Sequence, residues 1–159
     1  MVRIQTEDFD VAALNAELRA TAGGKAGAMV TFTGYVRDQA DGTATESLFL
    51  EHYPGMCERE IEDVCAQARA RWPILDTLVV HRVGELHLNE QIVYVGVTSA
   101  HRGDAFRACE FIMDVLKTRA PFWKRETLAD GQRFWVQQRD SDARKTDSWN
   151  TTADTSKHV

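Results

Sequence analysis

Apolar and polar residues alternate in two segments of the first third of the chain, which is the pattern of a strand with one buried face. The alternation in residues 28–37 predicts one strand, and Gly34 interrupts it as a bulge would. Residues 48–53 repeat the pattern after Asp41-Gly42, a pair typical of tight turns. We therefore expect these two strands to pair as neighbours in one sheet.

Three other segments place apolar residues at the three- and four-residue spacing of an amphipathic helix. In the first, Asp10 is the expected cap of a helix that runs to about Ala20. Pro73 stops the second helix, and the third ends near Arg119 because Pro121 follows. The apolar positions of the second and third helices are Ile61, Val64, Cys65, Ala68, Trp72, Ala105, Ala108, Cys109, Ile112 and Leu116.

β-branched residues dominate residues 78–83 and 92–98 and predict two more strands, of which the second is nearly continuously apolar and therefore central. Residues 122–127 and 133–138 flank Asp130-Gly131 and predict a closing hairpin. Helices and pairs of strands do not alternate strictly along the chain. This order favours an α+β sandwich with a largely antiparallel sheet.

Length and composition fit one soluble globular domain, since 43% of the 159 residues are hydrophobic and 27% are charged. We expect this domain to span residues 1–140. The sequence that follows is rich in Asp, Ser, Thr and Lys, so residues 141–159 are predicted to form a polar, mobile tail. No apolar run is long enough to cross a bilayer, and the first ten residues lack the apolar core of a secretory signal, which indicates a cytoplasmic protein.

The three cysteines, Cys57, Cys65 and Cys109, are odd in number and far apart, with no Cys-x-x-Cys pair. This spacing disfavours both a disulfide framework and a zinc site. We expect half-buried structural thiols, and neither a metal nor a cofactor.

Positive charge gathers in one segment of an otherwise acidic chain. Residues 101–125 contain six basic and three acidic residues, whereas the whole chain has a net charge of −5. Such a segment fits a confined anion site better than a nucleic-acid surface, which usually needs a basic domain. A solvated helix face with ordinary ion pairs explains the same charges, and charge alone does not separate the two interpretations.

Several basic residues stand where anions are commonly bound. His101 and Arg102 lie between a buried strand and a helix start, where backbone N–H groups and the helix dipole favour an anion. Capping or solvation of the loop is the alternative role. Arg37 follows a strand end, from which its guanidinium could bind phosphate or carboxylate through two hydrogen bonds.

Lys117 stands at the edge of the apolar face of the third helix, so we expect its stem to be partly desolvated. Desolvation or a nearby cation lowers the pKa of a lysine and makes its amine usable as a nucleophile or base. Lys124 and Glu126 share one face of the following strand. The turn at Pro121 makes both lysines candidates for one pocket, although an ordinary surface role suits each of them as well.

Five segments form a distinctive ordered set. They read Phe-Thr-Gly-Tyr-Val-Arg at 32–37, Leu-Glu-His-Tyr-Pro-Gly-Met at 50–56, His-Arg-Val-Gly-Glu-Leu at 81–86, Val-Gly-Val-Thr-Ser-Ala-His-Arg at 95–102, and Met-Asp-Val-Leu-Lys-Thr-Arg-Ala-Pro-Phe-Trp-Lys-Arg-Glu at 113–126. Together they resemble the large-subunit family of molybdopterin synthase. The match extends over about residues 4–140 and leaves the polar tail outside it.

The resemblance implies an α/β hammerhead fold and a homodimer of large subunits with a small ubiquitin-like subunit at each end, a heterotetramer. It also implies a sulfurtransferase of molybdenum cofactor biosynthesis. The thiocarboxylated C-terminus of the small subunit would deliver two sulfurs to cyclic pyranopterin monophosphate and so form the dithiolene of molybdopterin. No cofactor, metal, nucleic acid or membrane partner is implied.

By position, the resemblance implies that Lys117 is the principal catalytic lysine and Lys124 the second. Arg139 matches an arginine that the other protomer contributes. Some members of the family carry a lysine where this chain has Tyr35, so one anion contact of the family is in doubt. The residues that the resemblance places around the substrate are Tyr35, Val36, Arg37, His101, Arg102, Lys117, Lys124, Arg125, Glu126 and Arg139.

Two other functions use the same sequence features. A non-catalytic dimeric scaffold of this fold would bind only the tail of a partner, but it has no need of a basic, partly buried anion site. A cysteine-persulfide sulfurtransferase would need a reactive thiol. Cys57 is its candidate, because it follows Met56 at a helix start where a thiolate could be stabilised.

Overall fold

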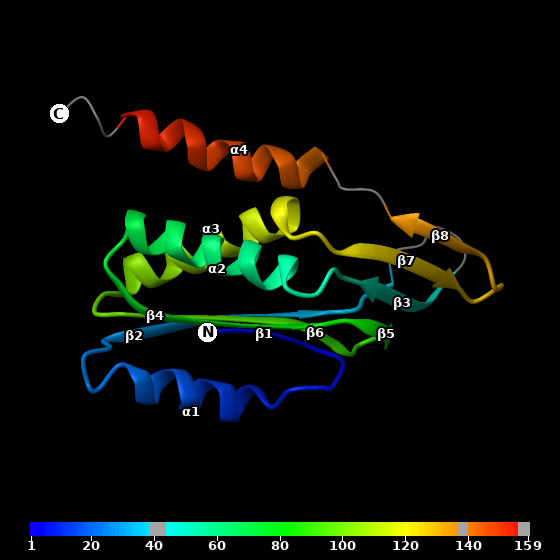
Figure 1. Cartoon of the computed structure of the whole chain (residues 1–159), viewed down its shortest axis with the longest axis horizontal. Helices are drawn as coiled ribbons and strands as arrows, with labels where there is room; N and C mark the ends of the chain where they lie inside the picture. Colours follow the sequence, from blue (N-terminus) through cyan, green and yellow to red (C-terminus); the bar gives the residue numbers. More distant parts are fainter. Residues whose placement is uncertain (39–43, 137–139, 156–159) are drawn as a thin grey trace.

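Two four-stranded sheets and four helices make up the part of the molecule that the structure describes (Figure 1). This computed structural model describes all residues except 39–43, 137–139 and 156–159. The strands are β1 (Val2–Gln5), β2 (Ala28–Tyr35), β3 (Thr45–Glu51), β4 (Ile74–Arg82), β5 (Gly84–His87), β6 (Gln91–Ser99), β7 (Trp123–Leu128) and β8 (Arg133–Val136). The helices are α1 (Val11–Thr21), α2 (Met56–Arg71), α3 (Arg102–Arg119) and α4 (Asp140–Thr155).

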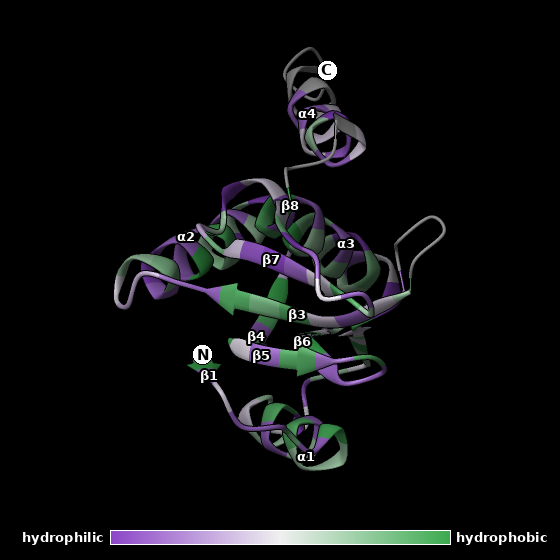
Figure 2. Ribbon diagram, turned by 90° about the vertical axis from the view of Figure 1, so that its right-hand side faces the viewer, coloured by the Kyte–Doolittle hydropathy of each residue, from purple (hydrophilic) through white to green (hydrophobic). Residues whose placement is uncertain are grey.

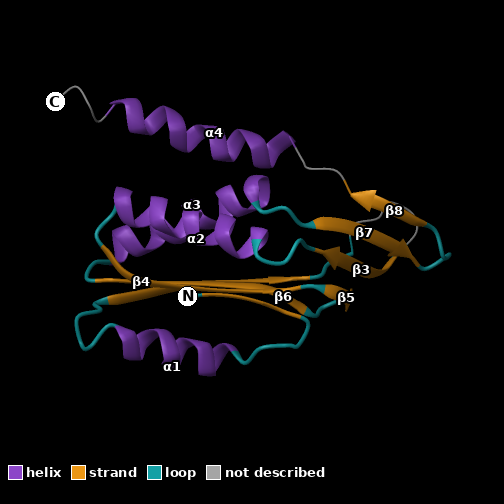
Figure 3. Cartoon of the chain, in the orientation of Figure 1, coloured by secondary structure: helices purple, strands orange, loops and turns teal. Residues whose placement is uncertain are grey.

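Sheet A, with the strand order β1-β4-β6-β2, forms the long body of the molecule, and sheet B, with the order β5-β3-β7-β8, stands at one end of it (Figure 1). Among the described strands only β1 and β4 pair in parallel. Helix α1 covers one face of sheet A, α2 and α3 cover the other, and α4 lies outside α3 (Figure 3). The predicted α+β fold with largely antiparallel pairing is confirmed, although the strands divide into two sheets.

Buried apolar side chains fill both sides of sheet A. The main core lies between sheet A and helices α2 and α3, and a smaller core lies between sheet A and α1. Full burial of each large aliphatic or aromatic side chain stabilises the fold by roughly 1.5–3 kcal/mol. Hydrophobic stretches run through the strands of both sheets, whereas α4 is largely hydrophilic (Figure 2). A third cluster, the sheet B core, consists of Val36, Leu48, Leu50, Val83 and Leu86.

Helix α1 begins and ends as the sequence predicts. The side chain of Asp10 accepts hydrogen bonds from the backbone N–H groups of Ala12 and Ala13, at 2.9 and 3.3 Å. Phe9 and Leu14 flank this cap and are buried together in the smaller core, as in a hydrophobic staple. The first residues of α1 and the two before it therefore set the orientation of this helix on sheet A.

The predicted pairing of residues 28–37 with residues 48–53 was wrong. Strand β2 pairs with β6, and β3 pairs with β5 and β7 in the other sheet. Alternation identifies a strand with one buried face but carries no information about its neighbour. The bulge is confirmed, because the register of β2 on β6 shifts between Gly34 and Tyr35. The predicted turn at Asp41-Gly42 lies outside the described residues.

Strands β1 and β5 were not predicted. Each has four residues, and such a short segment shows no clear period of its own. β1 pairs in parallel with the buried strand β4, and β5 pairs with β3 in the connection between the two predicted strands 78–83 and 92–98. Both are strands because a longer strand beside them offers unpaired backbone groups.

Residues 140–155 form helix α4, where the composition favours a mobile tail. The Trp149 ring packs edge-on against Trp72 and Phe111, with centroid distances of 5.5 and 5.7 Å. Its indole N–H donates to the Asp114 carboxylate at 2.8 Å, and the Thr146 hydroxyl donates to the Asp114 carbonyl at 2.9 Å. Contacts with α3 thus hold a helix that has no continuous apolar face. Within the described part of the chain, no helix is long and apolar enough to cross a membrane.

Candidate functional site

Lys117 lies in the last turn of α3 and lines a pocket of about 400 Å³. One wall of this pocket is the face of α3 on which positions 106, 110, 113 and 117 follow one another at helical spacing. The other walls come from β2 and α4. The polar and large apolar residues that line it are Thr31, Phe32, Phe106, Glu110, Met113, Asp114, Lys117 and Lys145. The apolar residues would shield one side of a bound ligand, while two lysines and two carboxylates share the polar side. Lys117 is exposed, so the expected desolvation of its stem was wrong.

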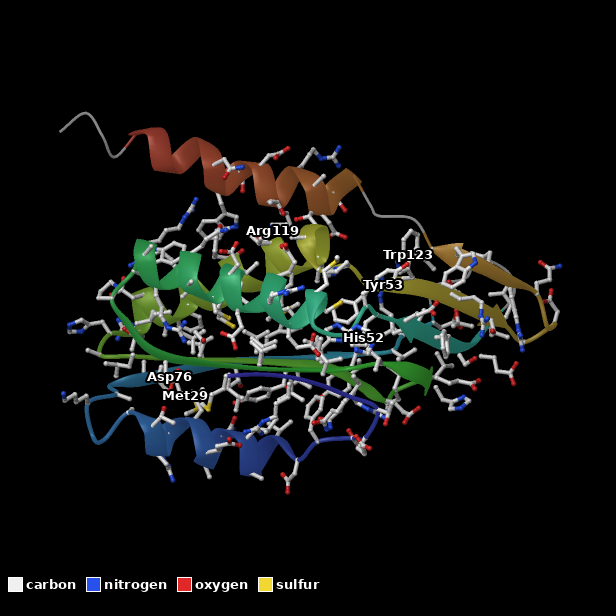
Figure 4. The ribbon with its side chains drawn as sticks, viewed as in Figure 1. Met29, His52, Tyr53, Asp76, Arg119 and Trp123 are labelled. Atoms are coloured by element: carbon white, nitrogen blue, oxygen red, sulfur yellow. The ribbon has the colours of Figure 1, made fainter. Side chains whose placement is uncertain are left out.

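The end of α3 that carries Lys117 is fixed to α2. The Arg119 guanidinium forms ion pairs with the carboxylates of Glu60 and Asp63, at 2.9 and 2.7 Å. Arg119 lies beneath α4 at the turn toward sheet B (Figure 4). Its hydrogen bonds raise the pKa of its own guanidinium and lower that of the Asp63 carboxyl. These contacts hold the last turn of α3 in one position relative to the sheets.

Lys124 lies on β7, five residues after α3 ends. It stands opposite Leu50 of β3 and Val136 of β8, on the sheet B face that also carries Glu126. This arrangement confirms the prediction that Lys124 and Glu126 share one face. The short turn between α3 and β7 connects the two candidate lysines along the chain. Lys124 is not among the residues that line the pocket of Lys117, so a pocket shared by both lysines stays a prediction.

Glu126 is only 5% exposed, and its carboxylate accepts a hydrogen bond from the Thr45 hydroxyl of β3. A buried carboxylate with such a partner holds β7 against β3. The expected contact of Glu126 with substrate stays a prediction.

Arg125 points to the opposite face of sheet B from Lys124. Its guanidinium lies over the Phe49 ring at 4.9 Å and near the Trp135 ring at 6.0 Å. The buried Nε of Arg125 has no hydrogen-bond partner among the described residues. Neighbouring Trp123 is exposed and lies close to Tyr53 at a shallow hollow (Figure 4). The side chain of Arg125 thus packs against aromatic rings of sheet B and does not line the pocket of Lys117.

His101 and Arg102 stand at the start of α3, as predicted. His101 is the N-cap residue, makes no side-chain capping bond and is exposed, as is Arg102. Fifteen residues of helix separate Arg102 from Lys117, a rise of about 22 Å. Within one chain, the structure therefore keeps these two basic sites apart.

The segment around Arg37 lies beyond the end of β2. Tyr35 is exposed, whereas Val36 is buried in the sheet B core, and its backbone pairs with Asn89 and Glu90. Arg37 is exposed next to them. Arg139 lies outside the described residues, so its predicted role stays a prediction.

Neither Lys145 nor His81 was predicted to be a functional residue. Lys145 lies in the segment that was expected to be mobile, and only the docking of α4 on α3 brings it to the pocket of Lys117. His81 lies in a strand, and strand patterning gives no information about which ring it stacks on. A pair of aromatic residues such as His81 and Phe122, separated by 41 positions, becomes visible only in the fold.

All three cysteines are buried. Burial raises the pKa of Cys57 and Cys65, and that of Cys109 to about 12. Because the thiolate is the reactive form, these thiols are poor nucleophiles near neutral pH. The expectation of structural thiols is supported, and Cys57 is buried rather than poised at an open helix start.

The fold and the site define an α+β protein with a lysine-bearing pocket where a long helix meets a second sheet. Comparison with known proteins gives the family. Residues 4–119 match the family of MoaE proteins. The chain is 51% identical to the molybdopterin synthase catalytic subunit of Vibrio cholerae over 149 residues, 93% of this chain and 97% of that protein.

Two solved structures are similar over most of their length. A molybdopterin biosynthesis MoaE protein from Burkholderia ambifaria is 48% identical with a TM-score of 0.80, covering 94% of this chain and 97% of that one. Molybdopterin synthase from Staphylococcus aureus is 33% identical with a TM-score of 0.77, covering 85% and 96%. The chain belongs to the MoaE protein family, a family of enzymes in molybdopterin biosynthesis. The predicted family and fold are confirmed.

Proposed function

We propose that this chain is the catalytic subunit of a molybdopterin synthase and acts as a sulfurtransferase. Its substrates would be cyclic pyranopterin monophosphate and the thiocarboxylated C-terminus of a small ubiquitin-like subunit. The observation that carries the proposal is the joining of Lys117, which lines a pocket, to Lys124 through one short turn. We place the reaction in the cytoplasm.

The proposed reaction brings together two anions, the thiocarboxylate and the pterin phosphate. Two lysines can offset their negative charge. In each transfer the carbon–sulfur bond of the thiocarboxylate breaks, and the acyl carbon takes oxygen from water to leave a carboxylate. On the pterin, the new carbon–sulfur bond replaces a carbon–oxygen bond, and the displaced oxygen leaves on the opened phosphate or as water. Ammonium groups at Lys117 and Lys124 would reduce the repulsion between thiocarboxylate and phosphate and stabilise negative charge on the acyl oxygen.

We further propose that the complete site needs two copies of the chain. His101 and Arg102 lie at one end of α3 and Lys117 at the other, so an antiparallel two-fold pairing of two α3 helices would place Arg102 of a second copy beside Lys117. Phe106, which is 61% exposed, and Phe32, which is 40% exposed, offer apolar area on this face. Arg139 of the second copy would add another cation to the same pocket.

The function is tested with three purified components: this chain, the thiocarboxylated small subunit and cyclic pyranopterin monophosphate. We expect the dithiolene product to form with two thiocarboxylates consumed per pterin, as measured by mass spectrometry. A small subunit with an ordinary carboxylate is the matched control and should bind without giving product. Binding of the thiocarboxylated subunit without turnover would instead support the non-catalytic scaffold.

Cys57→Ala should leave sulfur transfer within about threefold of the parent chain, because a buried thiol with a raised pKa is not expected to carry sulfur. The rate of dithiolene formation by this variant measures the effect directly. The change removes one buried sulfur atom and should cost about 1 kcal/mol of stability, which a thermal unfolding curve would report. A hundredfold slower variant with an intact fold would revive the persulfide mechanism.

A further inference from the structure

His81 is a partly buried titratable group that the proposed reaction does not use. It lies at the end of β4, opposite Val93 of β6 and two positions after Val79, and these two valines belong to the main core. Its ring therefore faces the side of sheet A that α2 and α3 cover. This is also the side on which the turn between α3 and β7 lies.

The hydrogen bond of His81 fixes which ring nitrogen carries the proton. Nδ1 is 2.8 Å from the carbonyl oxygen of Arg82. A carbonyl oxygen can only accept, so Nδ1 must donate, and in the neutral ring Nε2 holds the lone pair. The contact also sets the plane of the ring.

Phe122 lies against the face of that ring. The two ring centroids are 4.0 Å apart with an interplanar angle of 12°, and the His52 ring is 6.5 Å from Phe122. Phe122 packs against both the main core and the sheet B core, and its backbone N–H donates to Ala120 at 2.8 Å. Phe122 thus helps to anchor the turn from α3 to β7 in the interior.

We propose that His81 is a positioning residue for the lysine pair: by stacking on Phe122 it fixes the turn that sets Lys124 relative to Lys117. The inference rests on the proposed function, because it assigns a role to the relative placement of these two lysines. His81 itself touches no reacting atom. Its effect on turnover passes through Phe122.

Charge supports this arrangement. Burial lowers the pKa of His81 to about 4, the hydrogen bond to Arg82 acts in the opposite direction, and the nearby charges of Lys124 and His52 lower it further. The ring is therefore neutral at pH 7 and adds no positive charge near Lys124. The unfolded chain binds a proton below its ordinary pKa of about 6.5, whereas the folded chain does so only near 4. The stability that the neutral ring provides is present above pH 6.5 and is lost as the pH falls toward 4.

The experiment compares His81→Ala with His81→Phe, which keeps a flat ring for stacking but cannot titrate. We expect His81→Ala to lower kcat at least tenfold while the Kd for the small subunit stays within about twofold. His81→Phe should return kcat to within about threefold of the parent. His87→Ala, at an exposed histidine of β5, is the matched control and should keep the parental kcat.

A second readout needs no substrate. The Tm of the parent should fall between pH 7 and pH 5 by more than the Tm of either His81 variant, since only the parent carries this linkage. Equal kcat values for His81→Phe and His81→Ala, or a parental kcat in His81→Ala, would overturn the inference. If the unmodified chain forms no dithiolene at all, the proposed function fails instead. The Tm measurement still tests the placement of His81 in that case, and an identical fall in Tm for parent and variants would reject that placement.

Discussion

Lys117→Ala should lower the rate of dithiolene formation at least a hundredfold, because it removes the candidate catalytic cation from its pocket. The side chain is exposed, so its truncation opens no core, and stability should stay within about 0.5 kcal/mol of the parent. Binding of the small subunit should also be retained. Single-turnover measurement of product with saturating thiocarboxylated partner separates the chemical step from binding.

Lys25→Ala is the matched control, since Lys25 is exposed in the loop after α1 and takes no part in the pocket. It should keep the parental rate. A Lys117→Ala chain that retains activity within about threefold of the parent would lose less than roughly 1 kcal/mol of transition-state stabilisation. Such a result would remove Lys117 from the catalytic role.

Mixing two inactive chains, Lys117→Ala and Arg102→Ala, should restore about a quarter of the parental activity if subunits exchange freely. Random pairing makes half of the dimers mixed, and each mixed dimer has one pocket with both residues intact. The expectation follows from the rise of about 22 Å along α3 between Arg102 and Lys117, which prevents one chain from supplying both. The same experiment with Arg139→Ala in place of Arg102→Ala should give the same recovery.

Subunit exchange is verified by mass spectrometry of the mixed dimers, with one parent chain isotopically labelled. Each variant alone should show less than a tenth of the parental rate. Demonstrated exchange without recovery would mean that the pocket is built within one chain, and the antiparallel pairing of α3 would have to be abandoned.

The elements that sequence patterns predicted are those whose defining residues lie within the element. Helix α1 is specified by Asp10 and the staple around it, and α3 by a repeat of apolar residues that stops before Pro121. Strands β1 and β5 depend on the edges of β4 and β3, and α4 depends on the contacts of the Trp149 ring with Trp72 and Phe111. The sequence patterns within these segments do not indicate which strands or rings they contact.

Some features of the candidate site likewise follow from local sequence patterns, and others depend on contacts between distant residues. The placement of Lys124 and Glu126 on one face follows from the period of a strand, and the placement of Arg102 at a helix start follows from the order of elements. The burial of Glu126 depends on Thr45, 81 positions away, and the charge state of His81 depends on Phe122 and Lys124. Such long-range contacts decide whether a charged residue is reactive or structural, and alternation alone does not report them.

Helix α3 also determines where the chain can change in length. One extra residue between Ala105 and Leu116 would turn Lys117 by about 100° around the helix axis and move it about 1.5 Å along it, away from the wall formed by β2. In a dimer whose pockets each combine Lys117 of one chain with Arg102 of the other, the same insertion would shift these two residues relative to each other in both pockets. We therefore expect natural variants to gain or lose residues in the connections between elements. Helix α3 should keep its length, because that length sets the distance between Arg102 and Lys117.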